Sequence, residues 1–392
     1  MFYRVSNAVI APNLIHDLNL NAESLGALGG AFFYSFALLQ IVMGVLLDRI
    51  GPRWVMSIFA LVGASGAFIF AVSHTLSIAF LGRTLMGIGM ACALMGSLKV
   101  FVLRFSAKQF STLAGTFVSI GTLGTLLATT PLAYLTMTIG WRMTFVGAGT
   151  ITTLLAFLLF WALGTVDIGR GKPATSPTNQ DERPSLSTLL KLVLGNLSFW
   201  QISSFAFFRY GTFVALQGLW LGTYLMAVKA FSPVQAGNIL MMLSIGYIVG
   251  APLSGYLADR VFRSPKMTAL WAIILYALFL IPLTGLVDLK TPTLYGTLFF
   301  AIGFFNSFGT LAYTHVKELF PLSMSGTAIA GVNFFVMAGG AILMPLLGKV
   351  IETISAKGSS YAAQAYHLAF LICFVGMAAS IVFYAFSKSR QR

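Results

Sequence analysis

Long apolar segments, separated by short polar turns, recur along the whole sequence. About 20 consecutive apolar residues are long enough for a helix to cross the hydrocarbon core of a bilayer. The pattern therefore predicts an all-α membrane protein. We expect twelve spans, at residues 1–18, 24–46, 54–73, 76–101, 112–138, 143–165, 197–227, 234–257, 267–287, 291–315, 323–352 and 363–386.

The longest polar stretch, residues 166–187, divides the spans into two groups of six. Its Gly, Pro, Ser and charged residues are typical of a flexible connector. The following run, 186–197, is amphipathic with Lys191 on its polar face, and we expect it to lie on the membrane surface. The expected units are an N-terminal six-helix half at 1–165, a linker at 166–196, a C-terminal six-helix half at 197–387 and a tail at 388–392.

Composition excludes a water-soluble globular protein. Hydrophobic residues make up 58% of the chain and charged residues only 9%, whereas soluble domains carry about 25% charged residues. The expected surroundings are therefore a lipid bilayer. The two cysteines lie in apolar segments without disulfide or metal-ligand spacing. We find no nucleophile–base cluster or phosphate-binding loop, so we expect no cofactor, no metal and no enzyme activity.

The net charge of +14 would suit a nucleic-acid-binding protein, but the distribution of the 24 Lys and Arg residues indicates another cause. Most of them fall on the side of the membrane that carries the linker. Cytoplasmic loops of membrane proteins hold such an excess of Lys and Arg. We therefore expect both termini in the cytoplasm and no nucleic-acid partner. The compact loops favour a bacterial inner membrane.

The two halves resemble each other in sequence. Residues 44–49 (GVLLDR) recur as residues 255–260 (GYLADR). A duplicated six-helix unit implies a solute pathway at the interface between the halves, near the midplane of the membrane. Similar offsets also pair Asn21 with Ser232, Gly26 with Gly237, and Gly87 with Gly303.

Residues 44–53 (GVLLDRIGPR) resemble the motif G-x-L-A-D-R-x-G-R-R, which joins spans 2 and 3 in transporters of the major facilitator superfamily (MFS). The match departs from the motif at Leu47 and Pro52. The resemblance implies an MFS fold of two pseudo-symmetric halves, and a monomer. The span 5 motif of drug/proton antiporters is not matched by residues 121–131, which disfavours drug efflux. Two further stretches resemble family motifs. One is Arg83, Gly87 and Gly89 in span 4, and the other is Gly140, Trp141, Arg142 and Phe145 at the junction of spans 5 and 6.

The motif between spans 2 and 3 implies a role in gating. Asp48 is expected at a helix end with Arg49 and Arg53 beside it. Such charges can pair with a neighbouring helix terminus in one conformation and release it in the other. The alternative is a solvated turn whose charges only set the topology. From the motif and its second copy, we expect a gating role for Gly44, Asp48, Arg49, Gly51, Arg53, Asp259 and Arg260.

Ionisable side chains inside a span are costly, so each is a functional candidate. All ten Asp and Glu residues map to span ends or loops, so no mid-span carboxylate is available to carry a proton or bind a cation. Arg4 in span 1 and Arg209 in span 7 occupy matching positions in the two halves. Guanidiniums from opposite halves can hold an anion between them. The alternative for Arg209 is that its side chain reaches back to the membrane surface.

Further polar residues fall in spans that line MFS cavities. Lys99 in span 4 and His315 in span 10 correspond between the halves and suggest a second anion or proton site; the alternative is that they anchor the helices at the membrane surface. Arg83 is expected to be a structural residue, together with Gly87 and Gly89. The polar and aromatic lining candidates are Phe33, Tyr34, Gln40, Tyr210, Gln217, Trp220, Asn306, Tyr313 and Asn333. Of these we assign substrate contact to Tyr34, Gln217, Asn306 and Asn333, and the three amides are the stronger candidates because a buried amide needs a partner.

Two features of the sequence resemble organophosphate:phosphate antiporters. They are the spacing from Arg4 to residues 12–14 (PNL) and the string RYG at residues 209–211. The resemblance implies that Arg4 and Arg209 bind phosphate, as the span 1 and span 7 arginines of that family do. Residues 220–225 (WLGTYL) resemble the family string W-S-P-T-Y-L but lie farther from Arg209. The span 5 histidine of that family has no counterpart.

The same resemblance places Arg4 deep in the membrane, although it is only the fourth residue. Span 1 is therefore expected to be truncated, or to begin upstream of Met1.

These patterns favour a secondary active transporter that moves a small organic or phosphate-bearing anion by alternating access. One alternative is a transporter of neutral or zwitterionic metabolites, such as an amino acid or dipeptide, or of drugs. The other is a receptor with the same fold that binds an anion without transporting it.

Overall fold

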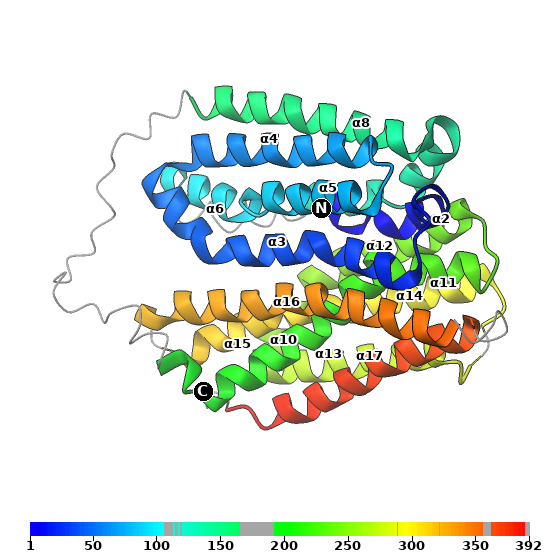
Figure 1. Cartoon of the computed structure of the whole chain (residues 1–392). Coiled ribbons are helices and arrows are strands. Elements are labelled where there is room, and N and C mark those ends of the chain that lie inside the picture. Colours follow the sequence, from blue (N-terminus) through cyan, green and yellow to red (C-terminus); the bar gives the residue numbers. More distant parts are fainter. Residues whose placement is uncertain are drawn as a thin grey trace.

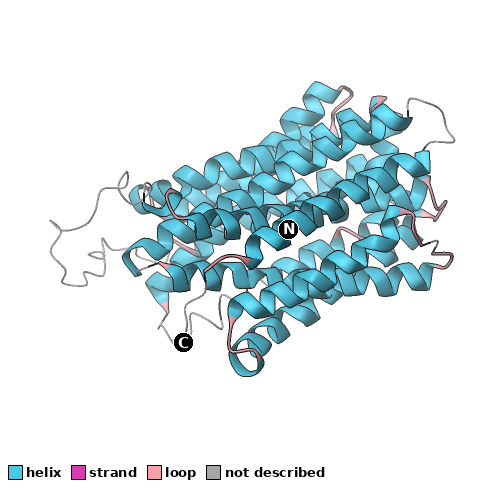
Figure 2. Cartoon of the chain, turned by 90° about the horizontal axis from the view of Figure 1, so that it is seen from below, coloured by secondary structure: helices cyan, strands magenta, loops and turns pink. Residues whose placement is uncertain are grey.

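The computed structural model describes residues 1–105, 113, 117, 120–164, 192–287, 289–320, 322–355 and 362–388, leaving out the side chains of residues 41, 45, 48, 102 and 322–327. All regular secondary structure in these ranges is helical (Figure 2). The long helices run side by side along one axis of the bundle (Figure 1). The predicted all-α fold class is therefore confirmed.

Caps and glycines set the boundaries of the N-terminal helices. The side chains of Asn21 and Thr75 accept backbone N–H groups at the starts of two of these helices. Gly51 and Gly140 have φ of 93° and 80°, which only glycine adopts without strain, and they allow the chain to turn sharply. The helices are α1 (Phe2–Val5), α2 (Asn7–Leu18), α3 (Ala22–Arg49), α4 (Pro52–Ala71), α5 (Leu76–Met90), α6 (Ala93–Arg104) and α8 (Thr130–Ala162), and residues 120–127 are also helical.

Proline begins several of the C-terminal helices. Pro233, Pro265 and Pro292 each occupy the first helical position, where the missing N–H has no intrahelical partner in any case. The elements are α10 (Leu197–Ala215), η2 (Leu216–Trp220), α11 (Leu221–Ala227), α12 (Pro233–Tyr256), η3 (Leu257–Val261), α13 (Pro265–Leu280), η4 (Ile281–Thr284), α14 (Pro292–Ser307), η5 (Phe308–Thr310), α15 (Leu311–Leu319), α16 (Leu322–Ser355) and α17 (Ala362–Ala385).

Within the described ranges, nine helical segments have the length and apolar character of membrane spans. Eight of them correspond to predicted spans 2, 3, 4 and 8–12. The ninth is α8, which runs through the turn at Gly140 and therefore joins the end of predicted span 5 to span 6. Predicted span 1 is divided into α1 and α2, and span 7 into α10, η2 and α11. Most of the predicted linker, and the tail after residue 388, lie outside the described residues.

The two halves are built alike, as their repeated sequence predicts. In the N-terminal half α5 packs closely on α3, and a Cβ atom added to Gly87 would lie 2.3 Å from the carbonyl oxygen of Phe32. In the C-terminal half α14 packs on α12, and a Cβ atom on Gly303 would lie 2.0 Å from the carbonyl oxygen of Leu243. Equivalent glycines therefore permit equivalent helix contacts.

The halves meet at one end of the bundle. The end where α8 stops and α10 begins is here called the linker end, and the opposite one the far end (Figure 1). At the far end, the backbone N–H of Ala22 on α3 donates to Glu352 Oε2 on α16 at 2.7 Å. Thr130 Oγ1 on α8 donates to Asn238 Oδ1 on α12 at 2.6 Å. Both hydrogen bonds join the two halves.

The halves diverge toward the linker end. Gly26 and Gly30 of α3 pack against α16. Residues four apart share one helix face, so Tyr34 and Leu38 continue this face toward the linker end. They are 44% and 67% exposed. The interface is therefore tightly packed at the far end and more open toward the linker end.

Candidate functional site

A partly open cavity lies where the two halves meet. The first residues of the chain contribute to it, and the chain begins between the two ends of the bundle (Figures 1 and 2). Its volume is about 80 Å³, and spans 1, 5, 7 and 8 supply its walls. Among the described residues that line it there is no Asp or Glu; they are Met1, Arg4, Val5, Thr122, Thr125, Tyr210, Phe213, Val214, Gln217, Ser244 and Tyr247.

Arg4 brings a positive charge directly to this cavity. It is held on the short helix α1, and its Nη1 donates a hydrogen bond to the hydroxyl of Tyr210 on α10. Its guanidinium carbon lies 5.8 Å from the ring centre of Phe36 and 5.9 Å from that of Tyr210. These aromatic rings attract the cation without neutralising it.

Arg209 also lies close to the Tyr210 ring. Its guanidinium carbon is 5.6 Å from the centre of that ring, and the side chain is 2% exposed. Nη1 donates to the backbone oxygen of Asn306 at 3.1 Å and to its Oδ1 at 3.3 Å. Gly309 makes room for it, because a Cβ atom there would lie 1.9 Å from Arg209 Cδ. Arg209 is therefore packed behind the cavity wall, while Arg4 forms part of the wall.

The two arginines leave the region positively charged. Within the described residues, neither forms an ion pair with a carboxylate. The buried Nε atoms of Arg4 and Arg209 also have no hydrogen-bond partner there. A buried donor without an acceptor is destabilising, so both guanidiniums keep hydrogen-bonding capacity that the described residues do not use.

A π-helical turn shapes the cavity wall in span 7. Such turns are frequent at functional sites. Gln217 lies in this turn, η2, and its Nε2 donates to Ser244 Oγ on α12 at 3.1 Å. Gly222, just after the turn, lets span 1 approach, because a Cβ atom there would lie 2.2 Å from the carbonyl oxygen of Ala8. The predicted substrate residue Gln217 thus lies in the cavity wall.

The structure does not bring the other predicted substrate residues into the cavity wall. Asn306 is fully buried and holds Arg209 instead. Asn333 accepts a hydrogen bond from the hydroxyl of Tyr313 at 3.0 Å. Tyr34 lies on the exposed face of α3 that opens toward the linker end.

The predicted Lys99–His315 pair is also absent from the cavity wall. His315 is 1% exposed, and both of its ring nitrogens are engaged. Nδ1 lies 2.9 Å from the Tyr384 hydroxyl, and Nε2 lies 2.9 Å from the backbone oxygen of Lys388. Lys99 is half-buried on α6. His315 therefore joins α15 to the end of α17, and we leave both residues out of the proposed site.

Arg83 has a packing role. It is fully buried on α5, and its Nη1 donates to the backbone oxygen of Tyr3 on α1 at 2.7 Å. Its guanidinium carbon lies 5.5 Å from the ring centre of Phe32. Gly87 and Gly89 allow this packing, since Cβ atoms there would overlap the neighbouring helices. The span 4 motif therefore holds α1, and with it Arg4, in place.

The predicted gating residues lie at the linker end. Nε of Arg53 donates to the backbone oxygen of Phe160 at 3.1 Å, and its guanidinium carbon lies 4.0 Å above the Phe160 ring, so Arg53 binds the end of α8. The side chain of Asp48 lies outside the described part of the chain. Gly51 provides the turn before α4. The exposed residues among the others are Gly44, Arg49, Asp259 and Arg260, and a Cβ atom added to Gly44 would meet nothing within 4 Å.

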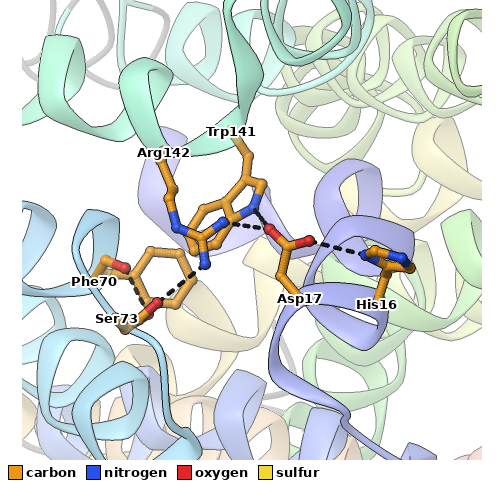
Figure 3. Close-up of polar contacts among 6 residues, drawn as sticks. All are labelled: His16, Asp17, Phe70, Ser73, Trp141 and Arg142. Carbon is orange, nitrogen blue, oxygen red and sulfur yellow. Dashed lines mark hydrogen bonds and ion pairs between the residues drawn. The ribbon is translucent and has the colours of Figure 1, made fainter.

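A polar cluster at the far end braces the N-terminal half (Figure 3). Asp17 on α2 accepts hydrogen bonds from Trp141 Nε1, at 2.9 Å, and from Arg142 Nη1, both on α8. Arg142 Nη2 also donates to the backbone oxygen of Ser73 at 3.2 Å, and His16 Nδ1 lies 3.0 Å from Asp17 Oδ1. The cluster therefore joins α2, the end of α4 and the turn within α8.

Sequence reasoning missed four lining residues that carry a hydroxyl group. Thr122 and Thr125 come from span 5, and Ser244 and Tyr247 from span 8. Hydroxyl side chains are frequent on apolar helices, where they bond to the backbone of the preceding turn. Their periodic position on the inward face of two spans was the only available signal.

Comparison with known proteins agrees with this architecture. The sequence matches the family model of the Major Facilitator Superfamily over residues 1–343 and again over 211–392. A probable hexose phosphate transport protein of Chlamydia trachomatis is 25% identical, covering 95% of this chain and 87% of that protein. The membrane sensor protein UhpC of Escherichia coli is 25% identical, covering 90% and 83%.

Among solved structures, the chain is similar to a bacterial homologue of the human lysosomal transporter Spinster in an inward-facing and unoccupied conformation. The TM-score is 0.78 at 19% identity, covering 98% of this chain and 92% of that one. The match to the family model covers the whole chain. The chain therefore belongs to the Major Facilitator Superfamily, a family of membrane transporters rather than enzymes.

Proposed function

We propose that this transporter carries a small organic or phosphate-bearing anion by alternating access, and that Arg4 binds the anionic group. The observation that carries the proposal is the position of Arg4 and Arg209 close to the ring of Tyr210, without a carboxylate partner among the described residues. Charge-assisted hydrogen bonds to guanidinium are strong and directional. Arg209 adds positive potential from behind the wall.

The rest of the cavity wall supports an organic substrate. The wall offers neutral hydrogen-bonding groups, which a solute with hydroxyl or carbonyl groups requires. They belong to Thr122, Thr125, Gln217 and Ser244. The cavity of about 80 Å³ is smaller than the roughly 300–1,000 Å³ of ordinary small-molecule sites. Binding therefore requires the wall to move, and the Arg4–Tyr210 hydrogen bond is the contact that an anion replaces.

The relative named as a probable hexose phosphate transport protein supports a phosphorylated substrate class. By the predicted charge bias, the linker end faces the cytoplasm of a bacterial cell and the bundle lies in the inner membrane. In this orientation the described conformation opens inward. We expect the carrier to work as a monomer, since spans from both halves of one chain build the cavity.

A second candidate is a receptor that binds an anion without transporting it. It is favoured by the similarity to the membrane sensor protein UhpC. A receptor and a carrier share the binding step but differ in accumulation, because only a carrier moves the ligand into a closed vesicle.

The test of the binding step is a thermal-shift series on the purified protein in detergent. Inorganic phosphate, a hexose phosphate, a small sulfonate and the corresponding neutral sugar would be compared for wild type, Arg4→Gln and Arg263→Gln. A ligand that binds only the native state raises its stability by about 2.7 kcal/mol at 100 times its Kd.

We expect anions to stabilise wild type and Arg263→Gln, whose exposed arginine lies in the turn before α13, but not Arg4→Gln. Stabilisation by the neutral sugar, equal in all three proteins, would contradict the anion site.

A further inference from the structure

A second hollow lies on the outer surface of the C-terminal half, between α12 and α14. Its volume is about 530 Å³, within the roughly 300–1,000 Å³ of small-molecule sites. None of its lining residues is charged. We call it the α12–α14 wedge, lined by Gln235, Asn238, Ile239, Met242, Pro292, Thr293, Gly296, Thr297 and Phe300.

Glycine packing explains why the wedge exists. Farther along the two helices, a Cβ atom on Gly246 would lie 2.1 Å from the backbone oxygen of Phe300, and one on Gly250 would lie 2.5 Å from that of Phe304. The helices therefore touch backbone to backbone there. Around Gly296 they do not, since a Cβ atom on this residue would meet only Met242 Cγ, at 3.6 Å. The two helices separate toward the far end and leave the wedge open.

The wedge lies between two helices that have the character of membrane spans. Both of its helices belong to segments with the length and hydropathy of membrane spans, Pro233–Val261 and Pro292–Leu319. Gln235, Asn238, Thr293 and Thr297 are exposed at its edges. An opening between two such segments would lie within the bilayer, so we infer that lipid can reach the wedge.

The polarity of the wedge changes along its length. Gln235 and Thr293 lie in the first turns of α12 and α14, at the far-end surface. Met242 and Phe300 lie seven residues farther along the same helices, which is about 10 Å deeper at 1.5 Å per residue. Amide and hydroxyl groups at the surface, above an apolar floor, match the ester and headgroup region of a lipid above its acyl chain.

We propose that the α12–α14 wedge binds one glycerophospholipid of the far leaflet, with an acyl chain against Met242 and Phe300 and its polar ester region at Gln235, Asn238 and Thr293. Asn238 also accepts the hydrogen bond from Thr130 that joins the halves at 2.6 Å. The lipid therefore sits beside a contact that closes the far end, and its occupancy favours that closed state.

The first test counts bound lipid by native mass spectrometry of the purified protein, with palmitoyl-oleoyl phosphatidylethanolamine as the probe. Gly296→Leu fills the wedge without striking the backbone. Gly147→Leu is the matched control, because it places the same side chain on an exposed face of α8 with nothing within 4 Å of its Cβ. We expect wild type and Gly147→Leu to retain one tightly bound phospholipid, and Gly296→Leu to bind it about tenfold or more weakly, since the apolar contacts are lost. Equal retention by all three proteins would overturn the proposal.

A second measurement does not depend on the folding of a variant. Wild-type protein in nanodiscs would be irradiated with a phosphatidylcholine that carries a diazirine near the end of one acyl chain. Crosslinks concentrated on peptides containing Met242 and Phe300 would support the assigned pose. Crosslinks spread evenly over all lipid-facing helices would contradict a built site.

Discussion

The guanidinium of Arg4, on α1, donates a hydrogen bond to the hydroxyl of Tyr210, on α10, and this contact crosses the interface between the two halves. The same tyrosine ring lies 5.6 Å from the guanidinium carbon of Arg209. Tyr210 therefore occupies the acceptor position that the anion would take in the proposed mechanism. Both halves of the transporter would respond when the anion replaces it.

Tyr210→Phe tests this replacement. Without the hydroxyl, the anion no longer competes for Arg4, and a net hydrogen bond to a charged group is worth about 1.5–3 kcal/mol. We expect the Kd for the anion to fall about tenfold, and the melting temperature of the ligand-free protein to fall as well. Isothermal titration calorimetry measures the first and intrinsic fluorescence the second. Weaker anion binding in Tyr210→Phe would mean that the hydroxyl contacts the substrate instead.

Asn306 offers a test of the role of Arg209. Asn306→Asp places a carboxylate where Oδ1 now lies 3.3 Å from Arg209 Nη1, so it neutralises this arginine without removing it. Asn306→Leu removes the side-chain oxygen that accepts the hydrogen bond from Arg209 but keeps the positive charge of Arg209. We expect anion affinity to fall about tenfold, or 1.4 kcal/mol, in Asn306→Asp and clearly less in Asn306→Leu. Equal losses in both variants would assign the effect to packing rather than to charge.

Gly309 fixes the position of Arg209 sterically. A Cβ atom there would lie 1.9 Å from Arg209 Cδ, and overpacking of this kind costs about 1–3 kcal/mol. We expect Gly309→Ala to lower the unfolding temperature and to weaken anion binding. Gly147→Ala, which has nothing within 4 Å, is the control. A Gly309→Ala protein as stable as that control would show that Arg209 packs elsewhere.

Glu352 holds the far end closed through the backbone N–H of Ala22, at 2.7 Å. A carboxylate at the start of a helix satisfies a free N–H group, and capping contributes about 0.5–2 kcal/mol. Glu352→Ala should therefore raise the population that is open at the far end by about tenfold, and Glu352→Gln, which keeps an acceptor, by less.

Maleimide labelling measures this opening. A cysteine introduced at Ala8, which is 1% exposed and packs against Gly222, would react faster when the far end opens. Cys92 and Cys373 are both buried and should contribute little background. Unchanged labelling of the Ala8→Cys protein after Glu352→Ala would exclude Glu352 from gating.

The fold could be predicted from the sequence because a bilayer imposes one strong rule, namely that every backbone polar group must be satisfied within a helix. Span length and the repeated glycines then fixed the two-half architecture. The slight irregularity of span 1 at Ser6, where the backbone keeps helical φ and ψ, and the π-helical turn at Leu216–Trp220 were not predictable. Neither feature has a periodic signal in one sequence.

The candidate site was predictable only in part. Charge inside an apolar span identified Arg4 and Arg209, and burial of an amide identified Gln217 and Asn306. The sequence could not show the direction of these side chains, by which Arg4 forms part of the cavity wall and Arg209 lies behind it. His315 looked functional because it corresponds to Lys99 in the other half and can titrate, but its partners Tyr384 and Lys388 are distant in sequence and could not be foreseen.

The most direct measurement of the central claim is uptake of radiolabelled phosphate or hexose phosphate into proteoliposomes preloaded with the same unlabelled anion. Wild type and Arg263→Gln should exchange the label to a level well above empty liposomes, and Arg4→Gln should not. Binding without exchange in wild type would favour the receptor. Exchange by Arg4→Gln at the wild-type rate would contradict the proposed anion site.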